Sequence, residues 1–216
     1  MTDRSMFLNC VAALVLVAGV SFYVQPVAAT TITFDDLSDN GFGTAIANGY
    51  QGLNWTNWFA LNTPLFTAQA GPNGAAAGTV TPPNIAFNAF GDLAIFSDSV
   101  FTLNSADFTA FWRDSLQVTV IGKLNGITTN TIAFSVSATA PTLETFNWAG
   151  IDEVDVSAAG GVHHTGYLGD GTQVAMDNLT LTITTPEPST LAIVGVALAG
   201  LGLARRRRKA AAQSEC

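Results

Sequence analysis

One stretch decides the fold class of this chain: Leu116-Gln117-Val118-Thr119-Val120-Ile121, then Asn125-Gly126, then Ile132-Ala133-Phe134-Ser135-Val136. Apolar and polar residues alternate in the first run, and a period of two indicates a strand with one buried face. Asn-Gly is the dipeptide that tight hairpin turns favour, because both residues adopt positive φ readily. The stretch therefore predicts an antiparallel β-hairpin that turns at Asn125 and Gly126.

The sequence around this hairpin repeats the same signals. Short runs rich in Val, Ile, Thr and Phe are separated by Gly, Asn, Asp and Pro, and they include Thr31–Phe34, Ile151–Val156 and Met176–Thr184. Residues 68–83, which are rich in Gly, Ala and Pro, predict a long surface loop. Residues 30–185 as a whole show no pattern that predicts a helix convincingly. Several short strands between turns predict an all-β fold for residues 30–184, an antiparallel β-sandwich of the jelly-roll type.

Charge is distributed unevenly along the 216 residues. The chain holds 16 acidic and 8 basic residues, but residues 30–185 hold 13 acidic residues against two basic ones, Arg113 and Lys123, a formal charge of −11. Nucleic-acid binding needs clustered Lys and Arg to neutralise phosphates, so this balance excludes it. The two cysteines, Cys10 and Cys216, both lie outside the segment, so we expect no disulfide in its fold.

The N-terminus has the pattern of an export signal. Arg4 supplies a positive charge, Met6–Val24 form an apolar stretch of 19 residues, and Val27-Ala28-Ala29 offers small residues to a signal peptidase. These features predict a signal peptide at residues 1–29, with an apolar helix and cleavage after Ala29. The alternative is an uncleaved membrane anchor, because a stretch of this length nearly spans a bilayer.

The C-terminus combines three elements in a fixed order. Pro186-Glu187-Pro188 comes first, and its prolines favour an extended, exposed entry. Seventeen uncharged residues lie between Glu187 and the next charge, and as a helix they would extend roughly 25 Å, which predicts a short transmembrane helix. The basic cluster comes last and predicts a stop on the cytoplasmic side of the membrane; it comprises Arg205, Arg206, Arg207, Arg208 and Lys209.

This order resembles the PEP-CTERM sorting signal of exported proteins from Gram-negative bacteria that make exopolysaccharide. The resemblance rests on Pro186-Glu187-Pro188, the apolar span and the basic cluster. It implies transport across the inner membrane, temporary anchoring there, and processing by an exosortase near the Pro-Glu-Pro motif. The chain would then divide into a signal peptide (1–29), a β-sandwich domain (30–184), a sorting signal (185–209) and a short tail (210–216).

Three segments of the central domain carry a second, more distant resemblance. Gly49–Trp55, Phe146–Asp152 and Ala175–Leu179 are similar to recurring segments of lectin-like or carbohydrate-binding β-sandwiches of secreted proteins. This resemblance implies an architecture only.

Two tryptophans are candidate glycan contacts. Trp55 and Trp58 lie in Asn54-Trp55-Thr56-Asn57-Trp58, where neighbouring amides can bond sugar hydroxyls. Indole faces are large and rigid, and they stack well on the apolar faces of sugar rings. The alternative is that both side chains belong to the core of the sandwich.

Three aspartates are candidate metal ligands. Asp35 and Asp36 end the first strand and Asp177 lies in the last one, so pairing of these strands would bring carboxylates together for structural Ca²⁺. The alternative is that they cap turns and carry solvated charge. The adjacent His163 and His164 have no third ligand at usable spacing, so we assign them no metal site. No cofactor besides calcium is predicted.

The central domain shows no pattern typical of an enzyme. It has neither a nucleophile-elbow motif nor a zinc-protease motif, so no catalytic activity is predicted. We expect an exported protein of the cell surface or extracellular matrix with a structural or adhesive role. Its expected partners are signal peptidase and exosortase during processing, the inner membrane transiently, and exopolysaccharide. Two alternatives stay open: a secreted glycan-active hydrolase, and a small-ligand or ice-binding surface module.

Overall fold

The computed structural model describes residues 28–183 together with Gly195 and Leu198. The predicted signal peptide up to residue 27, all but two residues of the predicted transmembrane helix, Pro186-Glu187-Pro188 and the basic cluster at 205–209 lie outside the described residues. Within the described part of the chain, no helix has the length and apolar character needed to cross a bilayer.

Strands dominate the domain. In chain order its elements are β1 (Thr30–Ile32), β2 (Thr44–Ala45), η1 (Tyr50–Gly52), β3 (Asn54–Thr56), β4 (Trp58–Asn62), α2 (Thr63–Ala70), α3 (Gly74–Gly78), β5 (Asn84–Asn88), η2 (Ala89–Gly91), β6 (Ala94–Ala110), β7 (Arg113–Leu124), β8 (Ile127–Val136), β9 (Thr142–His163) and β10 (Val174–Ile183).

These strands form one antiparallel sheet. The path through it runs β2-β4-β5-β10-β6-β9-β7-β8, while β1 pairs with β10 and β3 pairs with β6. The first and last strands of the domain are therefore neighbours, with Thr30 opposite Leu181. The prediction of a mainly antiparallel β fold is confirmed, whereas the sandwich and its jelly-roll connectivity stay predictions.

Strands β7 and β8 form the hairpin that the sequence predicts. Leu124 pairs with Ile127 across a two-residue turn. Asn125 has φ 51° and Gly126 has φ 76°, the positive values that a tight hairpin turn needs. The apolar side chains of the alternating run, such as Val118, are buried, as the period of two predicts.

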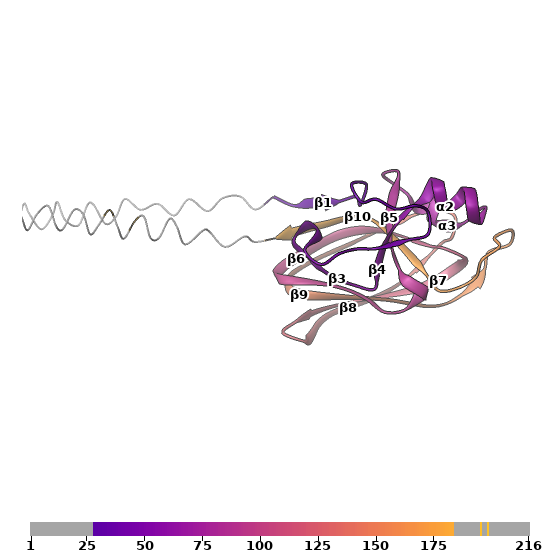
Figure 1. Cartoon of the computed structure of the whole chain (residues 1–216). Coiled ribbons are helices and arrows are strands. Elements are labelled where there is room, and N and C mark those ends of the chain that lie inside the picture. The colour runs from indigo at the N-terminus through magenta and orange to yellow at the C-terminus, as the bar shows by residue number, and fades with distance from the viewer. Residues whose placement is uncertain (1–27, 184–194, 196–197, 199–216) are drawn as a thin grey trace, which may run out of the picture.

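The sheet curls and encloses one main core. The rings of Phe108 on β6 and Phe134 on β8 lie 5.4 Å apart between centroids, although β9 and β7 separate these two strands in the sheet. Register shifts interrupt the pairing of the two longest strands, β6 and β9. Such bulges bend a strand, so β6 and β9 bend with the curled sheet (Figure 1).

Helix α3 and the end of helix α2 lie within residues 68–83, for which the sequence predicted a surface loop. Asn62 and Asn73 are their N-caps, and each side-chain oxygen accepts an N–H of the first turn at 3.1 Å. Helix α3 packs closely on β6, because a Cβ at Gly74 would overlap the carbonyl oxygen of Ala110. The loop prediction is wrong here because Gly- and Ala-rich composition was given more weight than the two capping residues.

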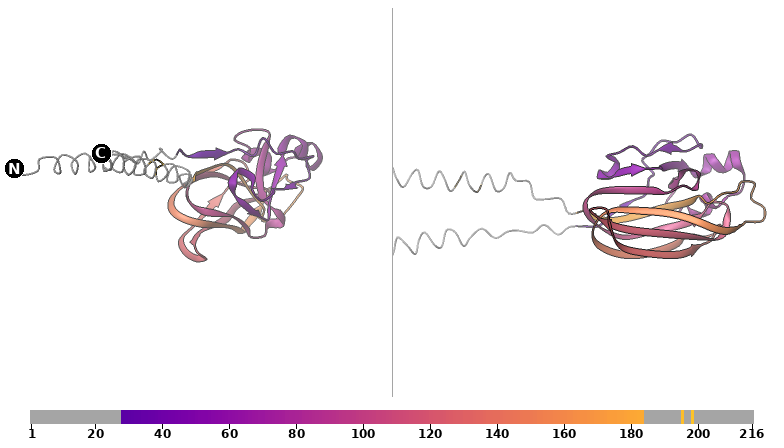
Figure 2. Two further views of the ribbon diagram at one scale, coloured as in Figure 1. Left: turned by 60° about the vertical axis from the view of Figure 1, so that its left-hand side comes forward. Right: turned by 90° about the horizontal axis from the view of Figure 1, so that it is seen from below.

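The two ends of the domain differ in what they carry. β1 begins and β10 ends at one end, whereas α2 and α3 lie at the opposite end (Figure 1, Figure 2). β10 connects the two: its first residue, Val174, pairs with Ala110 beside α3, and its last is Ile183. The candidate site lies at the end with the helices, which we call the helical end.

Candidate functional site: an aromatic cleft

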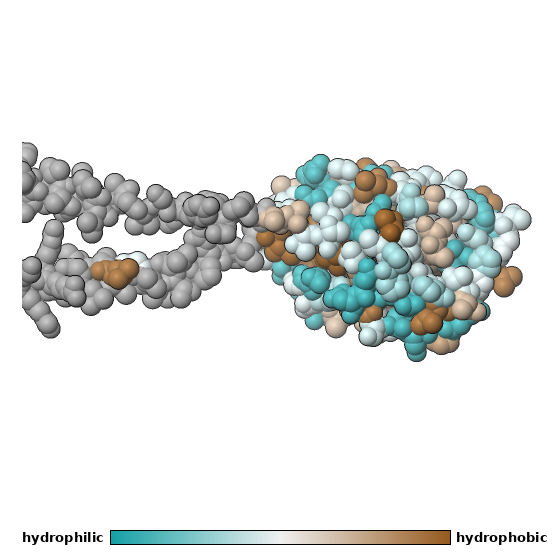
Figure 3. Space-filling view, turned by 90° about the horizontal axis from the view of Figure 1, so that it is seen from above, coloured by the Kyte–Doolittle hydropathy of each residue, from teal (hydrophilic) through white to brown (hydrophobic). Residues whose placement is uncertain are grey.

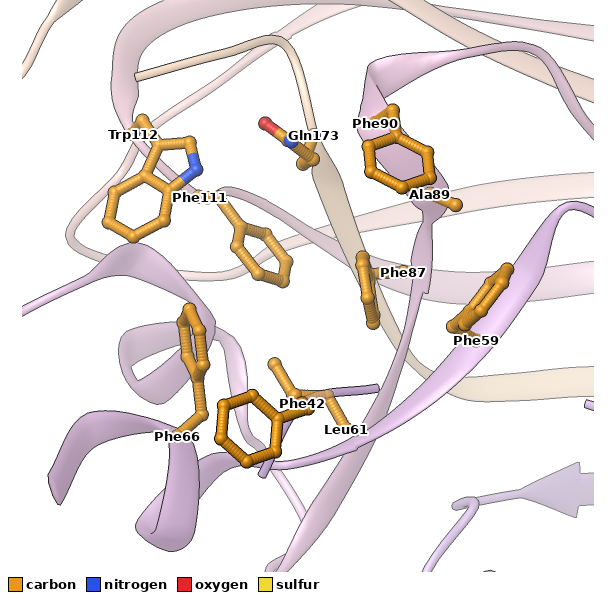
Figure 4. Close-up of a pocket in the computed structure, with 10 residues that line it drawn as sticks. All are labelled: Phe42, Phe59, Leu61, Phe66, Phe87, Ala89, Phe90, Phe111, Trp112 and Gln173. Atoms are coloured by element: carbon orange, nitrogen blue, oxygen red, sulfur yellow. The ribbon is translucent and has the colours of Figure 1, made fainter. Parts of the chain in front are cut away.

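A cleft of about 210 Å³ opens at the helical end of the domain (Figure 4). Of its ten lining residues, nine are apolar and seven of these are aromatic. They come from strands β4 and β5, helix α2, and four connecting segments: Phe42, Phe59, Leu61, Phe66, Phe87, Ala89, Phe90, Phe111, Trp112 and Gln173. We call this set the aromatic cleft.

Strand pairing builds part of the wall of the aromatic cleft. Phe59 on β4 pairs with Phe87 on β5, and their ring centroids are 5.9 Å apart. Successive side chains of a strand point to opposite faces. Trp58 and Ala60 therefore enter the main core, while Phe59 and Leu61 face the cleft.

The loop that carries Phe42 is fixed by one carboxylate. Asp39 accepts the N–H groups of Gly41 and Gly43 at 2.8 and 3.0 Å. It also accepts the N–H of Asn62, at the start of α2, at 2.9 Å. Both glycines have positive φ, 87° and 89°, which side chains with a Cβ avoid. The loop thus holds Phe42 outward, and this residue is 76% exposed.

Phe90 carries two local costs. It lies in η2 with φ 55° and ψ 8°, a left-handed conformation that is rare for a bulky residue. It is also 85% exposed, so its ring gains little from burial. The turn around it is held by Asn88, whose side chain accepts the N–H of Val174 at 2.6 Å and donates to the Asp92 carbonyl oxygen at 2.9 Å. Strained, exposed residues of this kind concentrate at ligand sites.

Gln173 supplies the one polar side chain among the residues that line the aromatic cleft. Figure 4 shows its amide between Trp112 and Phe90. Within the described part of the chain, its Oε1 atom is buried and has no hydrogen-bond partner. A buried acceptor without a donor is unfavourable. The oxygen lies against the backbone at Gly171, so a donor from a ligand would meet it only after the amide turns about its last side-chain torsion, which is soft.

The loop between β9 and β10 covers Trp112. A Cβ at Gly169 would lie 2.6 Å from the indole, so the loop backbone packs directly on the ring. Arg113 pairs with Asp170 at 2.6 Å, and the hydrogen bond from this guanidinium lowers the pKa of Asp170 to about 2. This ion pair ties the loop to the first residue of β7, directly after Trp112.

Trp55 and Trp58, the predicted glycan contacts, lie in the main core. They are only 5% and 1% exposed, and their rings meet edge to face at 6.5 Å. The Trp55 indole N–H donates to the Tyr50 carbonyl oxygen at 3.0 Å. Neither ring offers a face to a sugar, so the stacking interpretation is corrected to its alternative, a role in the core.

The three predicted calcium ligands have separate hydrogen-bonding roles. Asp177 is fully buried and accepts two N–H groups of the segment after α3 at 2.8 and 2.9 Å, and burial raises its pKa. Asp35 accepts the N–H of Asn84 at 3.0 Å, while Asp36 accepts the hydroxyl of Tyr50 at 2.6 Å. These contacts match the alternative in which the aspartates cap and fix turns.

The two histidines also take separate partners. His163 contacts the Gly169 carbonyl oxygen at 2.9 Å, and His164 contacts the Asp114 carboxylate at 2.7 Å. Among residues 28–183, no group of three or more His, Cys, Asp or Glu side chains is placed to hold a metal ion. Calcium binding therefore stays a prediction for which these residues form no ligand set.

Sequence reasoning missed the aromatic cleft, although one signal pointed to it. Phe42 stands between two glycines, and Phe90 is followed directly by Gly91. A large apolar residue next to glycine in a turn-rich segment is poorly placed for burial. Both of these phenylalanines are indeed exposed at the cleft.

Residues 184–209 match the PEP-CTERM protein-sorting motif, which confirms the resemblance drawn from the C-terminal residues and marks the chain for exosortase-dependent export. No curated protein matches the chain.

Several solved structures are similar to the fold. A DUF4465 family protein from Bacteroides caccae ATCC 43185 is 10% identical, with 76% of this chain and 97% of that chain covered and a TM-score of 0.48. A DUF4465 family protein from Bacteroides ovatus ATCC 8483 is 6% identical, with 73% and 95% covered and a TM-score of 0.41. TmCBM61, solved in complex with β-1,4-galactotriose, is 9% identical, with 67% and 98% covered and a TM-score of 0.32.

Proposed function

We propose that this chain, which carries the PEP-CTERM sorting motif, is an exported binding module of the cell surface or its polysaccharide matrix. Its aromatic cleft would hold a glycan without cleaving it. The observation that carries the proposal is the display of Phe42 and Phe90 at the mouth of a preformed aromatic cleft, one of them in a strained backbone conformation.

The size and lining of the cleft suit one ring of a polymer. Small-molecule pockets usually enclose roughly 300–1,000 Å³, and a cleft of about 210 Å³ accommodates a smaller group. Rigid aromatic faces pack well against the C–H faces of sugars at low cost in side-chain entropy. A glycan chain that extends across the surface would place one residue in the cleft and leave its neighbours in solvent.

The lining favours binding over hydrolysis. Glycosidases use a pair of carboxylates about 5 to 9.5 Å apart. The ten residues of the aromatic cleft include no carboxylate, imidazole, thiol or hydroxyl group that could serve as an acid, a base or a nucleophile. The hydrolase alternative would need a second site elsewhere on the protein.

One observation favours a second candidate function, the binding of a small apolar ligand. Gln173 is the single polar side chain of the lining, and a ligand with few polar groups would fit such a wall. The face that Figure 3 shows gives no further indication, since its hydrophobic residues lie in separate patches among hydrophilic and neutral ones.

The test is a binding experiment with the full chain purified in detergent. The protein is screened on a glycan array, and the best oligosaccharide is titrated by calorimetry while product release is followed by chromatography. We expect binding without release of sugar. The Phe42→Ala variant should weaken binding by on the order of tenfold, through loss of one stacking contact.

The matched control is Ile127→Ala, which removes a side chain that is 70% exposed and lies outside the aromatic cleft. This variant should bind like the unaltered chain. Release of sugar, or equal weakening by both variants, would contradict the proposal. Tight binding of a small apolar dye with no glycan binding would favour the second candidate.

A further inference from the structure

The aromatic cleft has only one polar side chain in its lining, and this limits how many polar groups a bound ligand can place inside it. Nine apolar residues and one amide line it. A plain hexose presents several hydroxyl groups, and those that entered the cleft would mostly be left without partners, at a cost in free energy. The part of the ligand that enters must therefore be largely apolar and carry about one donor for Gln173.

The position of the Gln173 amide sets where that donor lies. Figure 4 places the amide beside the rings of Trp112 and Phe90. Its Oε1 atom has no partner within the described part of the chain and is closed to solvent against Gly171, so it accepts from a ligand only after the amide turns toward the cleft. A matching group needs an N–H or O–H within a few bond lengths of an apolar end. A secondary amide that ends in a methyl group has this layout.

Charge limits the ligand further. Residues 30–185 carry a formal charge of −11. The described part holds one Arg and one Lys, and both form ion pairs. Arg113 pairs with Asp170, and Lys123 pairs with Glu153 and Asp155. The net negative charge would repel anionic glycans, and both cations of the described part are already paired. Neutral or cationic glycans would not be repelled.

We propose that the aromatic cleft recognises the acetamido group of an N-acetylated amino sugar in a neutral or cationic glycan. The methyl group packs on the rings, and the amide N–H donates to Gln173 Oε1 once the Gln173 amide has turned toward the cleft. Where such a glycan is partly deacetylated, its ammonium groups are attracted by the net negative charge of residues 30–185. This inference rests on the proposed function, because it names the ligand class of the same site.

The experiment compares oligosaccharides of equal length on the full chain. Calorimetry is carried out with a tetramer of β-1,4-linked N-acetylglucosamine, with the glucose tetramer of the same linkage, and with a tetramer of uronic acids. We expect the N-acetylated tetramer to bind on the order of tenfold more tightly than the glucose tetramer, with no binding of the uronic acid tetramer.

A variant links this preference to the amide. Gln173→Leu keeps a side chain of similar size but removes both polar groups. It should lower affinity for the N-acetylated tetramer to the level of the glucose tetramer. If the variant does not fold, the preference of the unaltered chain among the three tetramers still decides.

The outcomes separate the two proposals. Equal affinity for the glucose and N-acetylated tetramers, or binding of the uronic acid tetramer, would overturn this inference and leave glycan binding in place. An unchanged preference in the Gln173→Leu variant would overturn the assigned role of the amide. Absence of binding to every glycan on the array would overturn the proposed function itself, together with this inference.

Discussion

Replacing Phe90 by glycine should separate binding from stability. Phe90 has φ 55° and is 85% exposed, so the folded domain gains little from its side chain and carries the strain of its backbone. If the Phe90 ring contacts a ligand, its removal should weaken binding by on the order of tenfold at almost no cost in folding free energy.

Three contributions to the free energy of unfolding nearly cancel. Glycine relieves the left-handed conformation, which costs other residues about 1–2 kcal/mol. Greater freedom of the unfolded chain lowers stability by about 0.5–1 kcal/mol. Loss of the covered part of the ring, roughly 30 Å² of a side chain that is 85% exposed, lowers it by about 0.8 kcal/mol. We therefore expect a net change within about 1 kcal/mol of zero, or a Tm shift of no more than about 4 °C.

The assay pairs urea unfolding with calorimetric titration of the glycan that the unaltered chain binds. Phe90→Ala is the matched variant: it removes the ring but keeps the strain, so it should weaken binding and be less stable than Phe90→Gly by up to about 1 kcal/mol. Destabilisation of Phe90→Gly by more than about 2 kcal/mol would show that the ring is structural. Unchanged affinity would show that it contacts no ligand. Either result refutes the reasoning.

Three further predictions concern other parts of the molecule. Asp39→Ala removes the acceptor that fixes the Phe42 loop, so it should destabilise the domain by about 1–3 kcal/mol in urea unfolding and also weaken glycan binding; full affinity would contradict the loop's role. The hydrogen bond from Arg113 lowers the pKa of Asp170 to about 2. The ion pair therefore stabilises the fold above the unfolded pKa of Asp170, and this stability is lost as pH falls from about 4 towards 2. Asp170→Asn should flatten the pH dependence of Tm in that window, and an unchanged slope would contradict the assignment. Deletion of Pro186–Cys216 should stop membrane-dependent processing in cells, read as the loss of a mass shift on immunoblots; unchanged processing would argue against exosortase sorting.

Local signals predicted the parts of the fold that depend on neighbours in sequence. Asn125-Gly126 identifies the β7–β8 hairpin because the turn geometry needs positive φ at both positions. The first and last strands do pair, which the calcium hypothesis assumed and did not predict. Helix α3 was missed because the Gly- and Ala-rich composition of residues 68–83 was given more weight than its capping residue, Asn73.

The candidate site could not be predicted, because its lining residues lie far apart in the sequence. The cleft takes side chains from seven segments, between Phe42 and Gln173, so no local pattern brings them together. The tryptophans show the converse difficulty. Trp55 and Trp58 lie in a polar, loop-like stretch, yet both are buried, because the face a strand residue presents is settled by the curling of the sheet around it.

Strand β10 separates the aromatic cleft from the residue at which the sorting motif begins. This strand starts next to Gln173, in the cleft, and ends at Ile183, one residue before the sorting motif begins. Ten residues of strand extend about 33 Å. The aromatic cleft and the start of the sorting motif therefore lie at opposite ends of the domain. If the proposed function holds, a polymer would occupy one end of the domain while exosortase processing takes place beyond the other.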